Sequence, residues 1–117
     1  MPDADTTVAF LRDKVRRFAD EREWEPFHSP KNLSMALAAE VAELMEHFLW
    51  LECSASREAT KDPAKREAIA DELADVACLV LNLSNSLDID LSDAVAAKMV
   101  KNAKKYPAEE FRGRFSR

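Results

Sequence analysis

Apolar side chains recur every three or four residues in four stretches of the chain, and a capping residue or a proline bounds each stretch. This period is typical of amphipathic α-helices, so we expect helices over about residues 6–23, 30–51, 63–87 and 91–106. The expected N-caps are Asp5 or Thr6, Ser29, Asp62 and Asp90, with Pro30 and Pro63 at first helical positions.

Four helices with short connectors predict an all-α protein built as an antiparallel four-helix bundle. Leu91, Val95 and Met99 are expected to face inward from the last helix. We expect one domain over residues 1–107 and a loosely ordered C-terminal tail over 108–117, where no period is visible. The polar connector 52–63 should be mobile. Long apolar stripes on so small a bundle also predict self-association, as a dimer or a dimer of dimers.

Acidic residues interrupt two of these apolar stripes. Between Leu37 and Leu44 the next step of the stripe falls on Glu40, and Glu43 follows three residues later on the same edge. A charge on a core-facing stripe is costly unless it is paired or bound to a metal. No Lys or Arg lies in the inward-facing run, so a divalent cation is the expected neutraliser.

The third expected helix repeats this arrangement, with Glu72 and Asp75 beside its own stripe at the same spacing. Two such pairs could place four carboxylates at one point. The alternative is that both pairs lie on solvated helix faces, where acidic residues three apart are common.

An aromatic cluster lies in the connector 22–30, where Trp24, Phe27 and His28 precede Pro30. These rings could cover one end of the bundle, or they could stack against a nucleobase. Trp50 follows Glu43 by seven residues, so on a continuous helix both would lie on one side. Such a site would reach from the phosphates to the base of a nucleotide.

Basic residues concentrate at the other end of the chain. Residues 1–97 hold 10 Lys/Arg against 20 Asp/Glu, whereas residues 98–117 hold 7 against 2. Lys98, Asn102 and Tyr106 recur every four residues beside Lys105, either as a solvated face or as a phosphate-binding stripe. The net charge of −5 argues against binding to a nucleic acid polymer.

Composition excludes several other classes of protein. The single glycine, Gly113, excludes a Walker loop and a Gly-rich dinucleotide motif. No apolar run approaches the roughly 18–20 residues that cross a bilayer, and the N-terminus lacks a basic, apolar signal pattern. We therefore expect a cytoplasmic protein without a membrane partner, in which Cys53 and Cys78 are free thiols.

These residues resemble the MazG-like superfamily of all-α nucleoside triphosphate pyrophosphohydrolases, and in particular its dCTP pyrophosphatase branch. The resemblance covers roughly residues 10–107 and is carried by residues 21–33, 40–44, 71–76 and 98–107, together with Trp50. The Glu-x-x-Glu and Glu-x-x-Asp pair marks the superfamily. The Trp-x-x-Phe-His-x-Pro-x-Asn-Leu segment is more specific to the branch.

The resemblance implies hydrolysis of a nucleoside triphosphate, dCTP or a 5-modified dCTP, to the monophosphate and pyrophosphate. A broad house-cleaning specificity is the alternative within this class. The implied ligands of Mg²⁺, for which Mn²⁺ could substitute, are Glu40, Glu43, Glu72 and Asp75. The implied nucleoside pocket comprises Trp24, Phe27, His28, Trp50 and Leu79, and the implied phosphate-binding residues are Lys98, Asn102, Lys105 and Tyr106.

Within that mechanism, Glu40 or Glu43 would orient and deprotonate the attacking water, and Lys98 with Lys105 would stabilise the departing pyrophosphate. Val15 and Leu79 depart from the polar or aromatic residues that the branch often has at these positions. The base preference therefore stays open on the sequence.

Two other functions fit parts of the pattern. An iron carboxylate bundle needs Glu-x-x-His on its helices. The one such spacing, Glu25 to His28, straddles Pro26, and His47 follows Glu43 by four residues instead of three. A non-enzymatic helical adaptor would keep the apolar stripes but would have no use for inward carboxylates.

Overall fold

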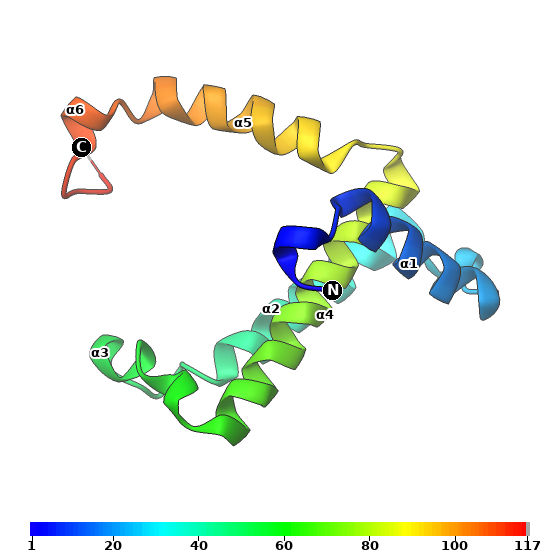
Figure 1. The fold of residues 1–117 in the computed structure, drawn as a ribbon, viewed down its shortest axis with the longest axis horizontal. Coiled ribbons are helices and arrows are strands. Elements are labelled where there is room, and N and C mark those ends of the chain that lie inside the picture. The colour runs from blue at the N-terminus through cyan, green and yellow to red at the C-terminus, as the bar shows by residue number, and fades with distance from the viewer. Residues whose placement is uncertain (117) are drawn as a thin grey trace.

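The computed structural model describes residues 1–116, and within this range the secondary structure is helical throughout (Figure 1). The α-helices are α1 (Val8–Glu21), α2 (Pro30–Glu46), α3 (Cys53–Ser56), α4 (Pro63–Leu87), α5 (Leu91–Lys105) and α6 (Ala108–Phe111). Short 3-10 turns cover Asp3–Asp5, Glu25–Phe27 and Ala59–Lys61. The predicted all-α class is therefore confirmed.

Side-chain caps fix where the long helices begin. Ser29, Asp62 and Asp90 accept hydrogen bonds from backbone N–H groups at 3.2, 3.1 and 2.9 Å, as predicted. The prediction for the first helix was wrong, because its cap is Thr7, whose Oγ1 accepts from the N–H of Phe10 at 3.1 Å. Thr6 instead donates its hydroxyl to the carbonyl of Pro2.

The centre of the fold is the antiparallel pair of α2 and α4, which lie side by side (Figure 1). Leu33 of α2 is 2% exposed, and Ile69 and Leu81 of α4 are each 8% exposed. Few other side chains reach this burial, because the described chain is open in shape, with principal extents of 47 × 38 × 31 Å. This pair therefore provides most of the core.

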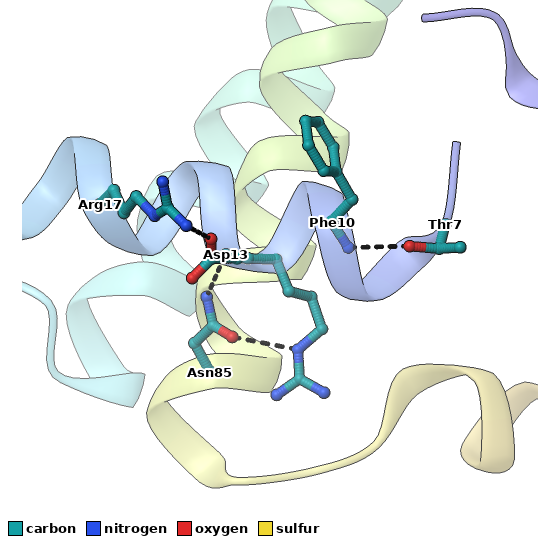
Figure 2. Close-up of polar contacts among 6 residues, drawn as sticks. Thr7, Phe10, Asp13, Arg17 and Asn85 are labelled. Atoms are coloured by element: carbon teal, nitrogen blue, oxygen red, sulfur yellow. Dashed lines mark hydrogen bonds and ion pairs between the residues drawn. The ribbon is translucent and has the colours of Figure 1, made fainter. Parts of the chain in front are cut away.

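Asn85 joins α1 to the C-terminal end of α4. Its Oδ1 accepts from Nε of Arg12 and Nη2 of Arg16, both at 3.0 Å, and its Nδ2 donates to the carbonyl of Arg12 at 2.9 Å. Figure 2 shows Asn85 directed from α4 toward α1, next to the surface ion pair of Arg17 and Asp13. Arg12 also donates to the carbonyl of Ser84 at 3.1 Å. Both ends of the Asn85 amide are thus used in packing α1.

The helix α2 ends at Glu46, five residues before the predicted end. The N–H groups of His47 and Phe48 bond three residues back instead of four, at 3.3 and 2.9 Å, so the backbone tightens into turns. Trp50 consequently lies beyond the end of α2. Its side chain is 90% exposed.

The connector after α2 is more ordered than its polar composition indicated. It contains α3 and the turn Ala59–Lys61, and Ala59 is buried where this turn packs against α4. In the tail, Ala108–Phe111 form α6, and the ring of Phe111 contacts Tyr106, with 5.1 Å between ring centroids. Residue 117 lies outside the described part of the chain.

The helix α5 projects away from α1, α2 and α4 (Figure 1). No residue of Leu91–Lys105 is buried, and Val95 and Met99 are more than half exposed. The prediction that they face inward was therefore wrong for the single chain. For the same reason the described chain alone does not close a four-helix bundle.

Two further predictions concern the chain as a whole. Cys53 and Cys78 are free thiols, as predicted. Among the helices described here, none is both long enough and apolar enough to cross a lipid bilayer. The cytoplasmic location stays a prediction.

The Asn85 contacts generate a stability prediction. Asn85→Ala should lower the free energy of unfolding by about 1–3 kcal/mol, because it removes the hydrogen bonds that the Asn85 amide makes to Arg12 and Arg16 at the helix crossing. Urea denaturation followed by circular dichroism measures this change. The control is Asn102→Ala, whose amide makes no hydrogen bond in the described structure and should shift stability by less than about 0.5 kcal/mol. Equal midpoints for both variants would contradict the assignment.

Candidate functional site

Three acidic side chains converge where α2 and α4 pack. Glu40 and Glu43 lie three residues apart on α2, so they share one edge of that helix. Glu72 approaches from α4. Each of the three offers a carboxylate oxygen that lies within 4.8 Å of the other two. The structure thus brings together three of the four carboxylates that the sequence singled out.

The cluster is partly buried and lacks a cationic partner. One oxygen of Glu40 and one of Glu72 are buried without a hydrogen-bond partner in the described structure. The ion pairs formed among residues 1–116 involve other residues of α1 and of the 3-10 turn before α4. Among residues 1–116, no side chain forms an ion pair that balances the negative charge of the cluster.

This environment changes how the cluster titrates. Burial raises the pKa of Glu40 from 4.5 to about 7, with further contributions from its hydrogen bond to Glu43 and from the charges of Glu43, Asp75 and Glu72. Burial is also the largest cause of the raised pKa of Glu72, followed by the charge of Glu43. Mutual repulsion without a nearby cation opposes full ionisation of this group.

Asp75 differs from the other three. It is exposed on α4, and its carboxylate is not among the oxygens that converge within 4.8 Å. Its charge nevertheless acts on Glu40 and Glu72. Asp75 therefore lies beside the three-carboxylate cluster rather than in it.

The donor set of this cluster fits a hard divalent cation. Mg²⁺ prefers carboxylate and other oxygen ligands and usually retains several waters. Such an ion would give the two buried oxygens a partner. It would also balance the negative charge of the cluster, which no Lys or Arg ion pair among residues 1–116 does. We find no comparable oxygen set elsewhere in residues 1–116.

The aromatic connector lies between α1 and α2. Trp24 contacts the rings of Phe18 and His28, with centroids 5.7 and 5.9 Å apart, and remains 40% exposed. His28 lines a cavity between the connector, α1 and α4. Phe27 is 66% exposed on the 3-10 turn. The rings thus offer accessible surface instead of only closing the end of a core.

The nucleoside residues predicted outside this connector have separate positions. Leu79 is half-buried on α4, seven residues after Glu72 and therefore on the same face. Trp50, by contrast, follows the end of α2, so the continuous helix on which its predicted alignment with Glu43 depended ends before it.

The four predicted phosphate-binding residues all belong to the α5 region. Lys98 and Asn102 lie on α5, and Lys105 places its Nζ 5.2 Å from the ring centre of Tyr106. Because α5 extends away from the α2–α4 pair, one chain does not bring these residues to the carboxylates (Figure 1). A cavity of about 480 Å³ lies at this end, lined by Lys104, Lys105, Tyr106, Phe111, Phe115 and Ser116.

The sequence analysis missed the polar residues at the C-terminal end of α4. Asn82 and Ser86 line the same cavity as His28, and Asn85 both lines it and binds α1. The available signal was the density of Asn and Ser in the last two turns of the helix.

Comparison with known proteins gives consistent results. A model of the MazG-like family matches residues 35–115. The dCTP pyrophosphatase 1 of Mus musculus is 38% identical over 107 residues, which are 92% of this chain and 63% of that protein. For the Homo sapiens protein of the same name the identity is 39% over 102 residues, 87% of this chain and 60% of that one. The chain thus spans about three fifths of these relatives.

A solved structure also matches. The crystal structure of a pyrophosphatase from Archaeoglobus fulgidus superposes with a TM-score of 0.75 at 39% sequence identity. The match covers 83% of this chain and 89% of that one.

The raised pKa of Glu40 predicts how the metal-free protein responds to pH. Between the unfolded value of 4.5 and the folded value of about 7, the folded state binds more protons than the unfolded state. Stability should therefore fall as pH rises through this window. Thermal unfolding in the presence of a chelator should show this decline, and Glu40→Gln should flatten it. Glu46→Gln, on the same helix, is the control and should retain the wild-type slope.

Proposed function

This chain belongs to the MazG-like family, and we propose that it hydrolyses a nucleoside triphosphate to the monophosphate and pyrophosphate. The observation that carries the proposal is the cluster of Glu40, Glu43 and Glu72, whose buried oxygens have no partner within the described chain. The names of the similar proteins, dCTP pyrophosphatase 1 and pyrophosphatase, support the same reaction class.

Glu40, Glu43 and Glu72 would hold Mg²⁺, with Asp75 adding negative charge at the edge of the site. Bound there, the ion would supply positive charge that offsets the negative charge developing during phosphoryl transfer. Mn²⁺ has a similar preference for oxygen ligands and could substitute.

The carboxylates also supply a base. Glu40 or Glu43 accepts a proton from a water molecule while the water oxygen bonds to the α-phosphorus. The bond from the α-phosphorus to the oxygen that bridges it to the β-phosphorus breaks. Pyrophosphate leaves with the electron pair. The raised pKa of Glu40, which results mainly from burial, is suited to a proton acceptor that works near neutral pH.

The substrate we propose is dCTP or a 5-modified dCTP. Trp24 and His28 provide accessible rings near the C-terminal end of α4, where α1 packs. Leu79 lies between this end and Glu72 along α4. Stacking on such rings is tolerant of base identity, so these residues alone are also consistent with a broad specificity. A panel of common and modified triphosphates, assayed for pyrophosphate release, distinguishes the two.

We further propose that a second copy of the chain completes the site. Lys98, Asn102, Lys105 and Tyr106 lie away from the carboxylates of their own chain, on a helix with an exposed apolar face. Val95, Met99 and Val100 on α5 are each more than half exposed, as are Met45 and Leu49 near the end of α2. Burying such surfaces between copies would bring α5 of one chain to the carboxylates of another and close the bundle, as a homodimer or homotetramer.

A variant series tests the reaction itself. Glu43→Gln and Glu72→Gln should each lower Mg²⁺-dependent pyrophosphate release from dCTP by at least about 100-fold, because each removes a negative oxygen ligand. Glu46→Gln is the control on α2 and should retain activity. Full turnover by both site variants would contradict the proposed function.

Mixing inactive subunits tests the shared site. If α5 acts on the partner's carboxylates, each mixed dimer of Glu43→Gln and Lys98→Ala chains contains one intact site. An equal mixture after subunit exchange should then regain about a quarter of wild-type activity. If Lys98 serves its own chain, no activity returns, since each chain then carries a defect in its own site.

A further inference from the structure

A second polar cavity lies along α4 beyond the carboxylates, with Asn82 ten residues, or about three helical turns, after Glu72. It has a volume of about 320 Å³ and is formed by α1, the aromatic connector and the end of α4. Its lining residues are Arg16, Ala19, Asp20, Glu25, His28, Asn82, Asn85 and Ser86. The volume is at the lower end of the range for small-molecule sites, and the lining is mainly polar.

Asn82 differs from its neighbour Asn85 in this cavity. Asn85 uses both ends of its amide to bind α1. The amide of Asn82 makes no hydrogen bond within residues 1–116, although the side chain is half-buried. It therefore keeps one acceptor oxygen and two N–H donors for a ligand.

The cavity follows Asp75 and Leu79 along α4, beyond the carboxylate cluster. Asn82 follows Asp75 by seven residues, and Ser86 follows Leu79 by seven, so each pair lies on one face about 10 Å apart. A nucleotide with its phosphates at the carboxylates and its sugar beside Leu79 would place its base near Asn82. The ring of His28, which contacts Trp24, borders the same space.

The charges around the cavity favour one kind of base edge. Asp20 and Glu25 contribute carboxylate acceptors, whereas the one cation of the lining, Arg16, donates to Asn85. Acceptors favour an exocyclic amine and oppose a carbonyl oxygen. An Asn amide can pair with an amine and the adjacent ring nitrogen through two parallel hydrogen bonds.

We propose that Asn82 determines base specificity by pairing with the exocyclic amine and ring nitrogen of cytosine. This inference rests on the proposed function for the position of the phosphates. Asn82 Oδ1 accepts from the amine, and Nδ2 donates to the ring nitrogen N3. A base that lacks the amine leaves Oδ1 without a partner in the cavity, which lowers its binding.

The test compares dCTP with the triphosphate of deoxyribosyl pyrimidin-2-one, which retains N3 but lacks the amine. The wild-type chain should prefer dCTP by about tenfold or more in kcat/KM. Asn82→Leu should lower kcat/KM for dCTP, which loses two hydrogen bonds, by about tenfold more than for the analogue, which loses only the hydrogen bond to N3, so the ratio approaches one. A ratio that stays at its wild-type value in Asn82→Leu overturns the proposal.

The matched control is Asn85→Ala, which removes an amide from the same cavity. It should lower the midpoint of thermal unfolding through the lost α1 contact while retaining the preference for dCTP, when assayed where the variant is folded. A loss of preference equal to that of Asn82→Leu would mean that general loosening of the cavity sets the ratio, and would also overturn the proposal.

A binding experiment separates this proposal from the reaction. On titration with dCMP, the side-chain amide resonances of Asn82 should shift in NMR spectra of the wild-type chain, and Asn82→Leu should bind at least about tenfold more weakly. If no triphosphate is hydrolysed but this binding holds, the proposed function fails and the assignment of Asn82 stands. If hydrolysis proceeds but dCMP binding is independent of Asn82, only the assignment fails.

Discussion

The packing of α2 against α4 brings three carboxylates together in a space where none of them forms an ion pair with a cation of residues 1–116. Glu40 takes a position on the helix face that leucines occupy one and two turns away, and Glu72 reaches the same point from the opposite helix. Desolvating like charges costs free energy, and the raised pKa values of Glu40 and Glu72 express that cost. A core built only for stability would have no reason to keep this arrangement. The divalent cation that we propose for this site would give it one.

The rest of the chain is arranged around this pair of helices. α1 is attached at the end of α4 by the amide of Asn85, and the aromatic connector leads directly from α1 into α2. Trp24 packs against Phe18 of α1, and His28 lies beside the end of α4. The carboxylates lie on α2 and α4. Asn85, which binds α1, and Asn82, whose amide makes no hydrogen bond within residues 1–116, lie three residues apart on α4.

The helix α5, unlike α1, α2 and α4, has no buried residue. A helix with Val95 and Met99 more than half exposed does not gain stability from its own chain, and it carries the basic residues that would balance the acidic cluster. Apolar surface and charge complementarity both favour association with a second copy. Residues 1–97 carry a net negative charge and residues 98–117 a net positive charge, so the two parts are complementary in charge.

The sequence alone determined the local features. Periodicity and capping located α4 from Pro63 to Leu87 and ended α5 before Pro107, because these signals depend on residues within one or two turns. The same periodicity identified Glu40 as an acidic residue on a core-facing stripe. Tertiary structure decided what depends on distant contacts. It ended α2 at Glu46 without a Gly or Pro signal, left Val95 and Met99 exposed, and separated Asp75 from the other three carboxylates. It also gave Asn85 both of its partners on α1 and left Asn82 without any, a difference between two identical side chains that depends on which part of the chain packs beside each.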